Sequence, residues 1–114
     1  MPTRYYLSLP DPQRARGADP ALAFRSQGPE GFAEELQDAL RTKDLFQRWC
    51  ATQDDPEDVD VALAATDPAA TVHGEQHDLH VELVATTSLP GNVVRQRLSL
   101  LAGNGWVLKD VTAA

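Results

Sequence analysis

Two stretches of the chain repeat their apolar residues with helical spacing, and strand-like alternation comes before, between and after them. The first stretch begins at Gly28-Pro29-Glu30, because proline fits the first position of a helix and acidic residues suit its positive end. Its apolar face consists of Phe32, Leu36, Ala39 and Leu40. The second stretch begins at Ser88-Leu89-Pro90 and ends at Gly103-Asn104-Gly105, with Val94, Leu98 and Leu101 on one face.

Strands are predicted where apolar and polar residues alternate. Residues 4–9 place Tyr5, Leu7 and Leu9 on one side, and residues 106–111 predict a last strand. Between the helices, residues 70–76 and 78–87 predict a hairpin that turns near Gln76 and His77. In its second strand, one face holds Leu79, Val81 and Leu83, and the other holds His80, Glu82 and Val84. A short extra strand is expected at Leu22, Phe24 and Arg25, pairing back on the first.

Two regions have a less regular pattern. After Arg41 the apolar stripe loses phase, which predicts a kink or restart near Thr42 to Asp44 with Asp44 as the cap. For residues 55–65 the pattern fits either a helix or a strand. Asp-Pro-Glu is a helix-start pattern, whereas Val59, Val61 and Leu63 alternate as in a strand. A short helix is slightly favoured there.

The order of these stretches predicts the fold class. At 114 residues the chain is too short for two separate cores, so residues 1–114 are expected to form a single α+β domain. We expect a two-layer sandwich, with a mixed or antiparallel sheet of about four to five strands. Two main helices would cover one face, as in a ferredoxin-like βαββαβ variant. Residues 10–20, with three prolines and a glycine, are expected to form a flexible loop.

Composition excludes several classes of protein. The longest uncharged run, residues 83–94, is too short for a membrane span and is broken by Pro90 and Gly91. The first residues lack the apolar core of a secretory signal, so a cytoplasmic location is expected. Cys50 is the only cysteine, which excludes an intramolecular disulfide and a thiolate metal cluster. Its position after Trp49 on an apolar helical face predicts a buried, inert thiol, and no cofactor is expected.

Charge is unevenly distributed along the sequence. The net charge is −7, and residues 49–94 hold nine acidic residues and no Lys or Arg. Such a chain repels a phosphate backbone over most of its surface, so we expect no nucleic acid among its partners. An acidic face suited to a basic protein partner is the simplest interpretation.

Three histidines, His73, His77 and His80, lie within eight residues and raise the alternative of a metal site. On a hairpin His73 and His80 would face each other, with Glu75, Asp78 or Glu82 adding oxygen ligands. Polar hairpin histidines without metal are the more ordinary interpretation.

A second alternative is a ferredoxin-like regulatory domain that binds a small anion near Arg95 and Arg97. The phosphate-loop, nucleophile-elbow and zinc-protease motifs are all missing from the sequence, so the chain is not expected to be an enzyme. The leading hypothesis is therefore a protein-interaction module with an acidic face. Its partner is unidentified, and a second copy of the chain, forming a homodimer, is one candidate.

Overall fold

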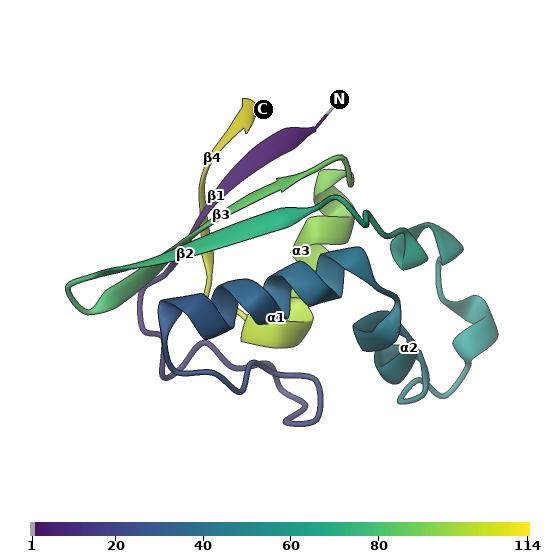
Figure 1. Cartoon of the computed structure of the whole chain (residues 1–114). Helices are drawn as coiled ribbons and strands as arrows, with labels where there is room; N and C mark the ends of the chain where they lie inside the picture. The colour runs from purple at the N-terminus through teal and green to yellow at the C-terminus, as the bar shows by residue number, and fades with distance from the viewer. Residues whose placement is uncertain (1) are drawn as a thin grey trace.

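In the computed structural model, which describes residues 2–114 apart from the side chain of Pro56, one sheet packs against helices (Figure 1). The strands are β1 (Thr3–Leu9), β2 (Thr71–His77), β3 (His80–Thr87) and β4 (Val107–Ala113). The helices are α1 (Pro29–Arg41), α2 (Asp44–Cys50) and α3 (Gly91–Ala102), with two short 3-10 helices, η1 (Pro56–Asp58) and η2 (Val61–Ala64). The sheet order is β2-β3-β1-β4, and every neighbouring pair is antiparallel.

The core lies between the sheet and the helices α1 and α3, which cover the same face (Figure 1). Tyr5 and Leu7 of β1 and Val81 and Leu83 of β3 are buried on this side. The helices contribute the residues expected from their spacing, namely Phe32, Leu36, Ala39, Leu40, Val94, Leu98 and Leu101. The opposite face of the sheet carries the alternate, mainly polar residues, as an antiparallel sheet with one solvated face should. The α+β two-layer class and the single-face placement of the helices are confirmed.

The extra strand expected at residues 22–25 is wrong, because this segment has no regular secondary structure. Leu22 and Phe24 are buried in a loop, where the Phe24 N–H donates to Leu101 O at 2.9 Å. Gly17 N–H donates to the same carbonyl at 3.1 Å. Carbonyls in the last turn of a helix lack intrahelical partners, so this loop completes the end of α3 instead of extending the sheet.

The predicted break after Arg41 is confirmed, since α1 ends there and α2 starts at Asp44. The capping role predicted for Asp44 is wrong: Lys43 is the N-cap, and Asp44 pairs with Arg48 at 3.2 Å within α2. Residues 55–65 are helical in part, as η1 and η2, and not a strand. Val61 is 84% exposed there. The alternation of Val59, Val61 and Leu63 therefore does not correspond to a strand of the sheet.

The hairpin is confirmed, but its turn lies at Asp78 and Leu79, two residues beyond the predicted position. The Gln76 side chain donates from Nε2 to Asp78 O at 2.9 Å and to His80 O at 3.0 Å. Asp78 has a φ of 53°, a left-handed conformation that aspartate tolerates better than most residues. Leu79 is consequently 87% exposed at the tip, and not on the buried face with Val81 and Leu83.

Residues 10–20 form a loop, as predicted, and parts of it pack against the body of the domain. Ala15 is fully buried, and Gly17 bonds the end of α3 as described above. The flexibility of this loop stays a prediction. Within residues 2–114 the three helices are all too short or too polar to cross a bilayer.

Candidate functional site

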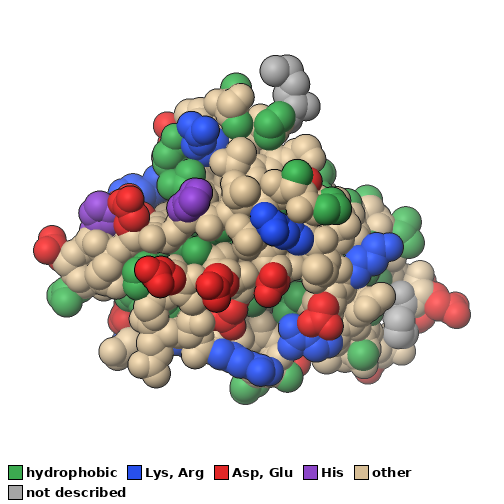
Figure 2. All heavy atoms as spheres, viewed as in Figure 1, with side chains coloured by type: hydrophobic (Ala, Val, Ile, Leu, Met, Phe, Trp, Pro, Cys, Tyr) green, Lys and Arg blue, Asp and Glu red, His purple; other side chains and the backbone are tan. Residues whose placement is uncertain are grey.

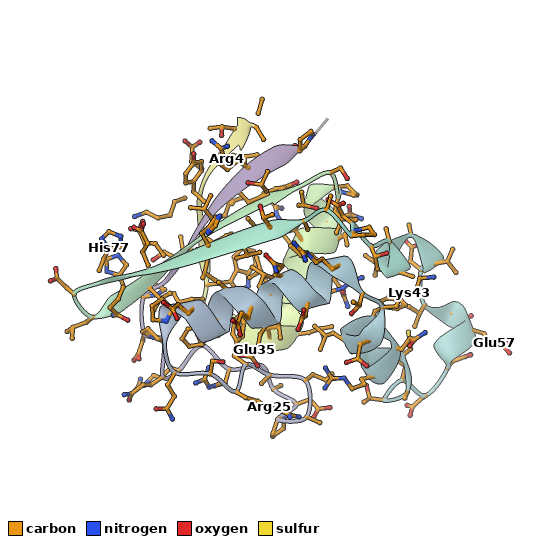
Figure 3. All side chains as sticks on the ribbon, viewed as in Figure 1. Arg4, Arg25, Glu35, Lys43, Glu57 and His77 are labelled. Atoms are coloured by element: carbon orange, nitrogen blue, oxygen red, sulfur yellow. The ribbon has the colours of Figure 1, made fainter. Side chains whose placement is uncertain are left out.

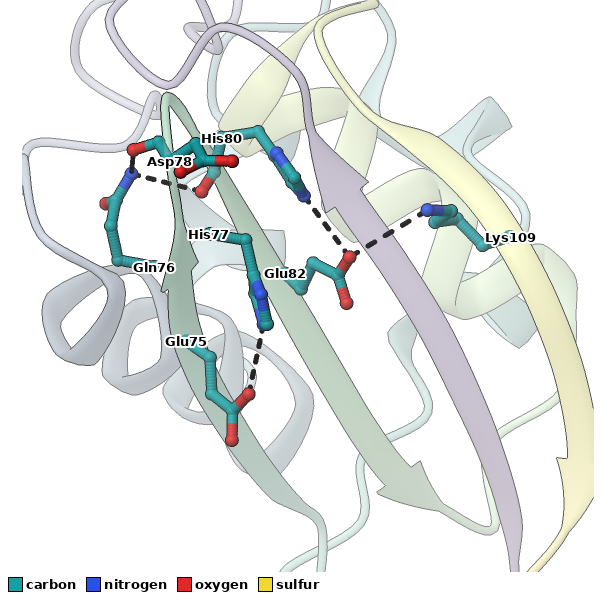
Figure 4. Close-up of polar contacts among 7 residues, drawn as sticks. All are labelled: Glu75, Gln76, His77, Asp78, His80, Glu82 and Lys109. Carbon is teal, nitrogen blue, oxygen red and sulfur yellow. Dashed lines mark hydrogen bonds and ion pairs between the residues drawn. The ribbon is translucent and has the colours of Figure 1, made fainter.

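The hairpin of β2 and β3 brings two of the three histidines together on the open face of the sheet (Figure 4). His77 is the cross-strand partner of His80, and their rings stack with centroids 5.7 Å apart. Each ring contacts a carboxylate on its own strand: His77 Nε2 lies 3.1 Å from Glu75 Oε2, and His80 Nε2 lies 3.2 Å from Glu82 Oε1. Four titratable side chains thus form one cluster, named here the hairpin cluster.

The geometry of the hairpin cluster balances its charges. Glu75 and Glu82 are directly opposite each other, and like charges in that position destabilise a strand pair. Lys109, whose Nζ lies 3.8 Å from Glu82 Oε1, offsets this repulsion, and each carboxylate also has a hydrogen-bond contact with an imidazole. The hydrogen bond from His80 is the main cause of a lowered pKa at Glu82. A solvated, mutually compensating cluster of this kind is typical of an open sheet face.

His73 is separate from this pair, since it lies opposite Val84 in the register and not opposite His80 as the sequence analysis expected. Among the residues that the structure describes, no group of three or more His, Cys, Asp or Glu side chains could hold a metal ion. The metal alternative therefore finds no support in this geometry.

The two arginines of the anion alternative have different environments. Arg97 is fully buried, and its guanidinium donates to three backbone carbonyls: Ala39 O, Leu63 O and Ala65 O. Arg95, two residues earlier on α3, is exposed on another side of the helix. Burial lowers the pKa of Arg97 from its ordinary value, although a guanidinium stays charged at neutral pH. The two side chains do not converge on one surface, so they cannot hold an anion jointly.

The acidic residues of the segment 49–94 lie in separate places in the fold. Figure 3 shows Glu57, among the acidic residues of 54–60, at one end of the molecule and His77, at the acidic hairpin, at the other end. Asp67 belongs to neither group, because its carboxylate is used inside the fold. A single acidic face made from residues 49–94 is therefore wrong, since the chain between these groups spans the length of the sheet (Figure 1).

A different acidic surface lies on α1. Glu30, Glu34 and Asp38 are all exposed, and their spacing of four residues puts them in one row along the helix. Figure 2 shows Asp and Glu side chains in a row over the face that α1 presents, with Lys and Arg side chains below and beside it. None of the ion pairs found within residues 2–114 includes these three carboxylates. We name this row the α1 acidic stripe.

The sequence carried a readable signal for the α1 acidic stripe. The spacing of Glu30, Glu34 and Asp38 is visible in the printed sequence, opposite the apolar residues that predict the helix. Sequence reasoning instead assigned the first acidic residues to the helix dipole and looked for an acidic face in a later segment. Helical spacing was therefore a better guide to a shared surface than the density of charge along the chain.

Two of the hollows on the described surface are formed by loops next to helices or strands. One, of about 170 Å³, lies between α1, α2 and the preceding loop and is lined by oppositely charged side chains, including Arg25, Glu35 and Arg48. The other, of about 460 Å³, is an open groove between the hairpin tip and the loop after β1. Neither is lined by a histidine or by Cys50, which is half-buried at the end of α2. The larger one has the volume of a ligand or peptide site.

Asp67 provides a prediction about stability. Its Oδ2 accepts hydrogen bonds from Thr87 Oγ1 at 2.8 Å and Ser88 N at 3.0 Å, and Oδ1 accepts from Ala69 N at 3.0 Å. The bond from the Ser88 backbone is the largest cause of its lowered pKa. Because the folded pKa lies below the unfolded one, Asp67 stabilises the protein above pH 3.8, and this contribution is lost as the pH falls through the folded pKa.

Asp67→Ala should therefore lower the free energy of unfolding at pH 7 by about 1 to 2 kcal/mol, because its hydrogen-bond donors lose a charged acceptor. Stability should also fall less steeply in the variant than in the wild type below pH 4. Urea denaturation from pH 7 down to about pH 2 measures both. Asp54→Ala, at an exposed carboxylate, is the control, and an equal loss in the two variants would contradict the role given to Asp67.

Comparisons of the chain with protein-family models, with curated proteins and with solved structures found no match. The function is therefore inferred from this chain's own surfaces. Those surfaces are the hairpin cluster, the α1 acidic stripe and the open groove.

Proposed function

We propose that this chain is a non-enzymatic protein-interaction domain that binds a basic partner through the α1 acidic stripe. The observation that carries the proposal is the row of three exposed carboxylates, Glu30, Glu34 and Asp38, outside every ion pair of the described chain. A surface of one charge attracts a partner of the opposite charge and guides its approach.

The α1 acidic stripe destabilises helix α1 by charge repulsion, and a basic partner would remove this repulsion. Like charges four residues apart on a helix destabilise it by about 0.2 to 0.5 kcal/mol per pair. Asp38 adds to this cost, because it lies near the carboxyl end of α1, where the helix dipole disfavours negative charge. Lys or Arg side chains from a partner would neutralise this repulsion on binding.

A basic partner fits the surfaces better than a second copy of the chain. Two α1 acidic stripes would repel each other in a symmetric pair, since such an interface joins identical patches. The free edge of β4 is also protected: the register shifts opposite Tyr6 and Leu7, and Asp110 Oδ1 accepts from Val111 N at 2.8 Å. Bulges and charged side chains at an edge strand discourage strand pairing. These two observations favour a basic partner over a homodimer that pairs through α1 or through β4.

Fluorescence anisotropy with a labelled eight-residue peptide rich in Arg tests the proposal. Binding should weaken at least tenfold between about 50 mM and about 500 mM salt, because exposed charges are screened. The triple variant Glu30→Gln, Glu34→Gln, Asp38→Asn should weaken binding at low salt at least threefold. It should keep its fold, with a melting temperature equal to or above that of the wild type because the repulsion along α1 is removed.

The matched control is Asp54→Asn, Asp55→Asn, Asp58→Asn, which changes the net charge by the same amount at exposed positions outside α1. Binding by this control should stay within twofold of the wild type. Equal losses in the two triple variants would show that net charge alone attracts the peptide, and the proposal would then be rejected. Peptide affinity that does not change with salt concentration would also reject the proposal.

A further inference from the structure

The open groove of about 460 Å³ lies at the end of the domain where the hairpin turns. One wall is the loop after β1, with Pro10, Asp11 and Pro12, and the other is the hairpin tip, with Asp78 and Leu79. We propose that this groove binds a linear segment of the basic partner in which an apolar side chain adjoins a Lys or Arg. This inference rests on the proposed function and names the site and the partner's chemistry.

The loop wall is held in place before any partner arrives. Two prolines fix their own φ angles and so limit the conformations of this wall. Arg14 N donates to Asp11 O at 3.0 Å, which closes a turn behind the groove. Ala15, next in the chain, is fully buried and anchors the loop to the core. A wall that is already ordered loses little entropy on binding.

The hairpin wall is held by the side chain of Gln76, which bonds the carbonyls of Asp78 and His80 as described above. These two bonds stabilise the left-handed conformation at Asp78. Backbone in a sparsely populated conformation is often found at binding sites, where the surrounding contacts maintain it. The turn therefore presents Asp78 and Leu79 toward the groove in a defined position.

Leu79 provides the apolar contact. It is 87% exposed, although a two-residue turn favours small or polar residues. Nothing in the fold needs a leucine here, because its side chain packs on none of the core residues. An apolar side chain of a partner that packs between Leu79 and the two prolines would bury all three at once. Burial of apolar area is the main favourable contribution to most protein association.

Two carboxylates provide the charged contact. Asp11 and Asp78 lie on opposite walls of the groove, and Asp78 is in no ion pair of the described chain. Arg14 pairs with Asp11 at 3.5 Å, but the two side chains are 89% and 58% exposed, so the pair is weak and screened. A Lys or Arg of the partner can therefore replace Arg14 at little cost.

The groove also adjoins the α1 acidic stripe. Gln27 lines the groove, and α1 begins two residues later at Pro29. A segment that leaves the groove at Gln27 meets Glu30 first and Glu34 next. The apolar anchor and the row of carboxylates can thus contact one continuous basic segment, which explains how an exposed hairpin leucine and the α1 acidic stripe could serve the same partner.

Two labelled peptides test this assignment with the full chain. The first contains Arg-Leu-Arg flanked by Ser and Gly, and the second replaces its Leu with Ser. Wild type should bind the first peptide about tenfold or more tightly than the second, as expected for burying one leucine. Leu79→Ser should bring the two affinities to the same level. Val61→Ser, at a residue 84% exposed at the other end of the domain, is the matched control and should change neither.

Charge variants separate the two contacts. Asp11→Asn together with Asp78→Asn should weaken both peptides, and asparagine keeps the left-handed turn accessible. Arg14→Gln should instead tighten binding, because it removes the competitor for Asp11. In amide NMR spectra the first peptide should shift residues 11, 13 and 76–80.

Three results would overturn the inference. Equal affinity of wild type for both peptides, no effect of Leu79→Ser, or NMR shifts confined to α1 would each exclude the groove. Salt-dependent binding that responds only to the α1 triple variant would exclude the groove and leave the proposed function standing. No binding of either peptide by the wild type would reject both.

Discussion

Replacing Arg97 with Met should lower the free energy of unfolding by about 3 to 5 kcal/mol, because several buried carbonyls lose their partner together. The guanidinium donates to Ala39 O at 3.2 Å, Leu63 O at 2.7 Å and Ala65 O at 3.0 Å. Its Cζ also lies 5.3 Å from the centroid of the Phe46 ring. Methionine fills much of the same space and makes none of these bonds.

The position of those carbonyls explains why the effect should be large. Ala39 O belongs to the last turn of α1, where helix carbonyls lack intrahelical partners, and a cation there interacts favourably with the helix dipole. Leu63 and Ala65 lie in and just after η2. One side chain on α3 thus joins three segments that are far apart in sequence, and its loss should loosen η2 and α2 before the sheet.

Urea denaturation measures the loss, and hydrogen exchange shows where it occurs. Amides of residues 60–66 should exchange faster in Arg97→Met, and amides of β1 and β3 should be less affected. Arg95→Met, on the exposed side of the same helix, is the matched control and should stay within about 0.5 kcal/mol of the wild type. Similar losses for the two variants would show that Arg97 has no special structural role.

Gly74→Ala should lower the free energy of unfolding by about 1 to 3 kcal/mol, although alanine in a strand normally stabilises relative to glycine. A Cβ at this position would lie 2.2 Å from Pro29 O and 2.8 Å from Pro29 C, which is closer than atoms can approach. Because these are backbone atoms of α1, the start of the helix would have to move away from β2. Steric overlap should therefore outweigh the gain in strand propensity.

Thermal and urea denaturation measure the loss at Gly74. His73→Ala is the neighbouring control, since His73 is exposed on the open face of β2 and should change stability by no more than about 0.5 kcal/mol. The displaced start of α1 should also shift Glu30 relative to the groove, so Gly74→Ala should weaken the Arg-Leu-Arg peptide. A variant as stable as the wild type would show that α1 and β2 can separate without cost.

The burial of Arg97 could have been predicted from the spacing of residues in α3. Val93, Arg97 and Leu101 follow one another at spacings of four, so Arg97 lies within the apolar stripe of α3. From the sequence, Arg97 is instead named with Arg95 as a candidate anion ligand, a role that needs an exposed guanidinium, as most arginines have. Its acceptors come from α1 and η2, which no local pattern connects to α3, so periodicity indicated the face and not the partners.

The sequence alone determined the helices, the hairpin and the α+β class, because periodicity and start and stop residues are properties of neighbouring positions. How separate segments meet depends on contacts that no local pattern specifies. Such contacts divide the acidic residues of 49–94 between two ends, bury Arg97, and place the hairpin turn beside Pro10 and Pro12. These outcomes depend on contacts between residues distant in the chain, where packing outweighs local preference.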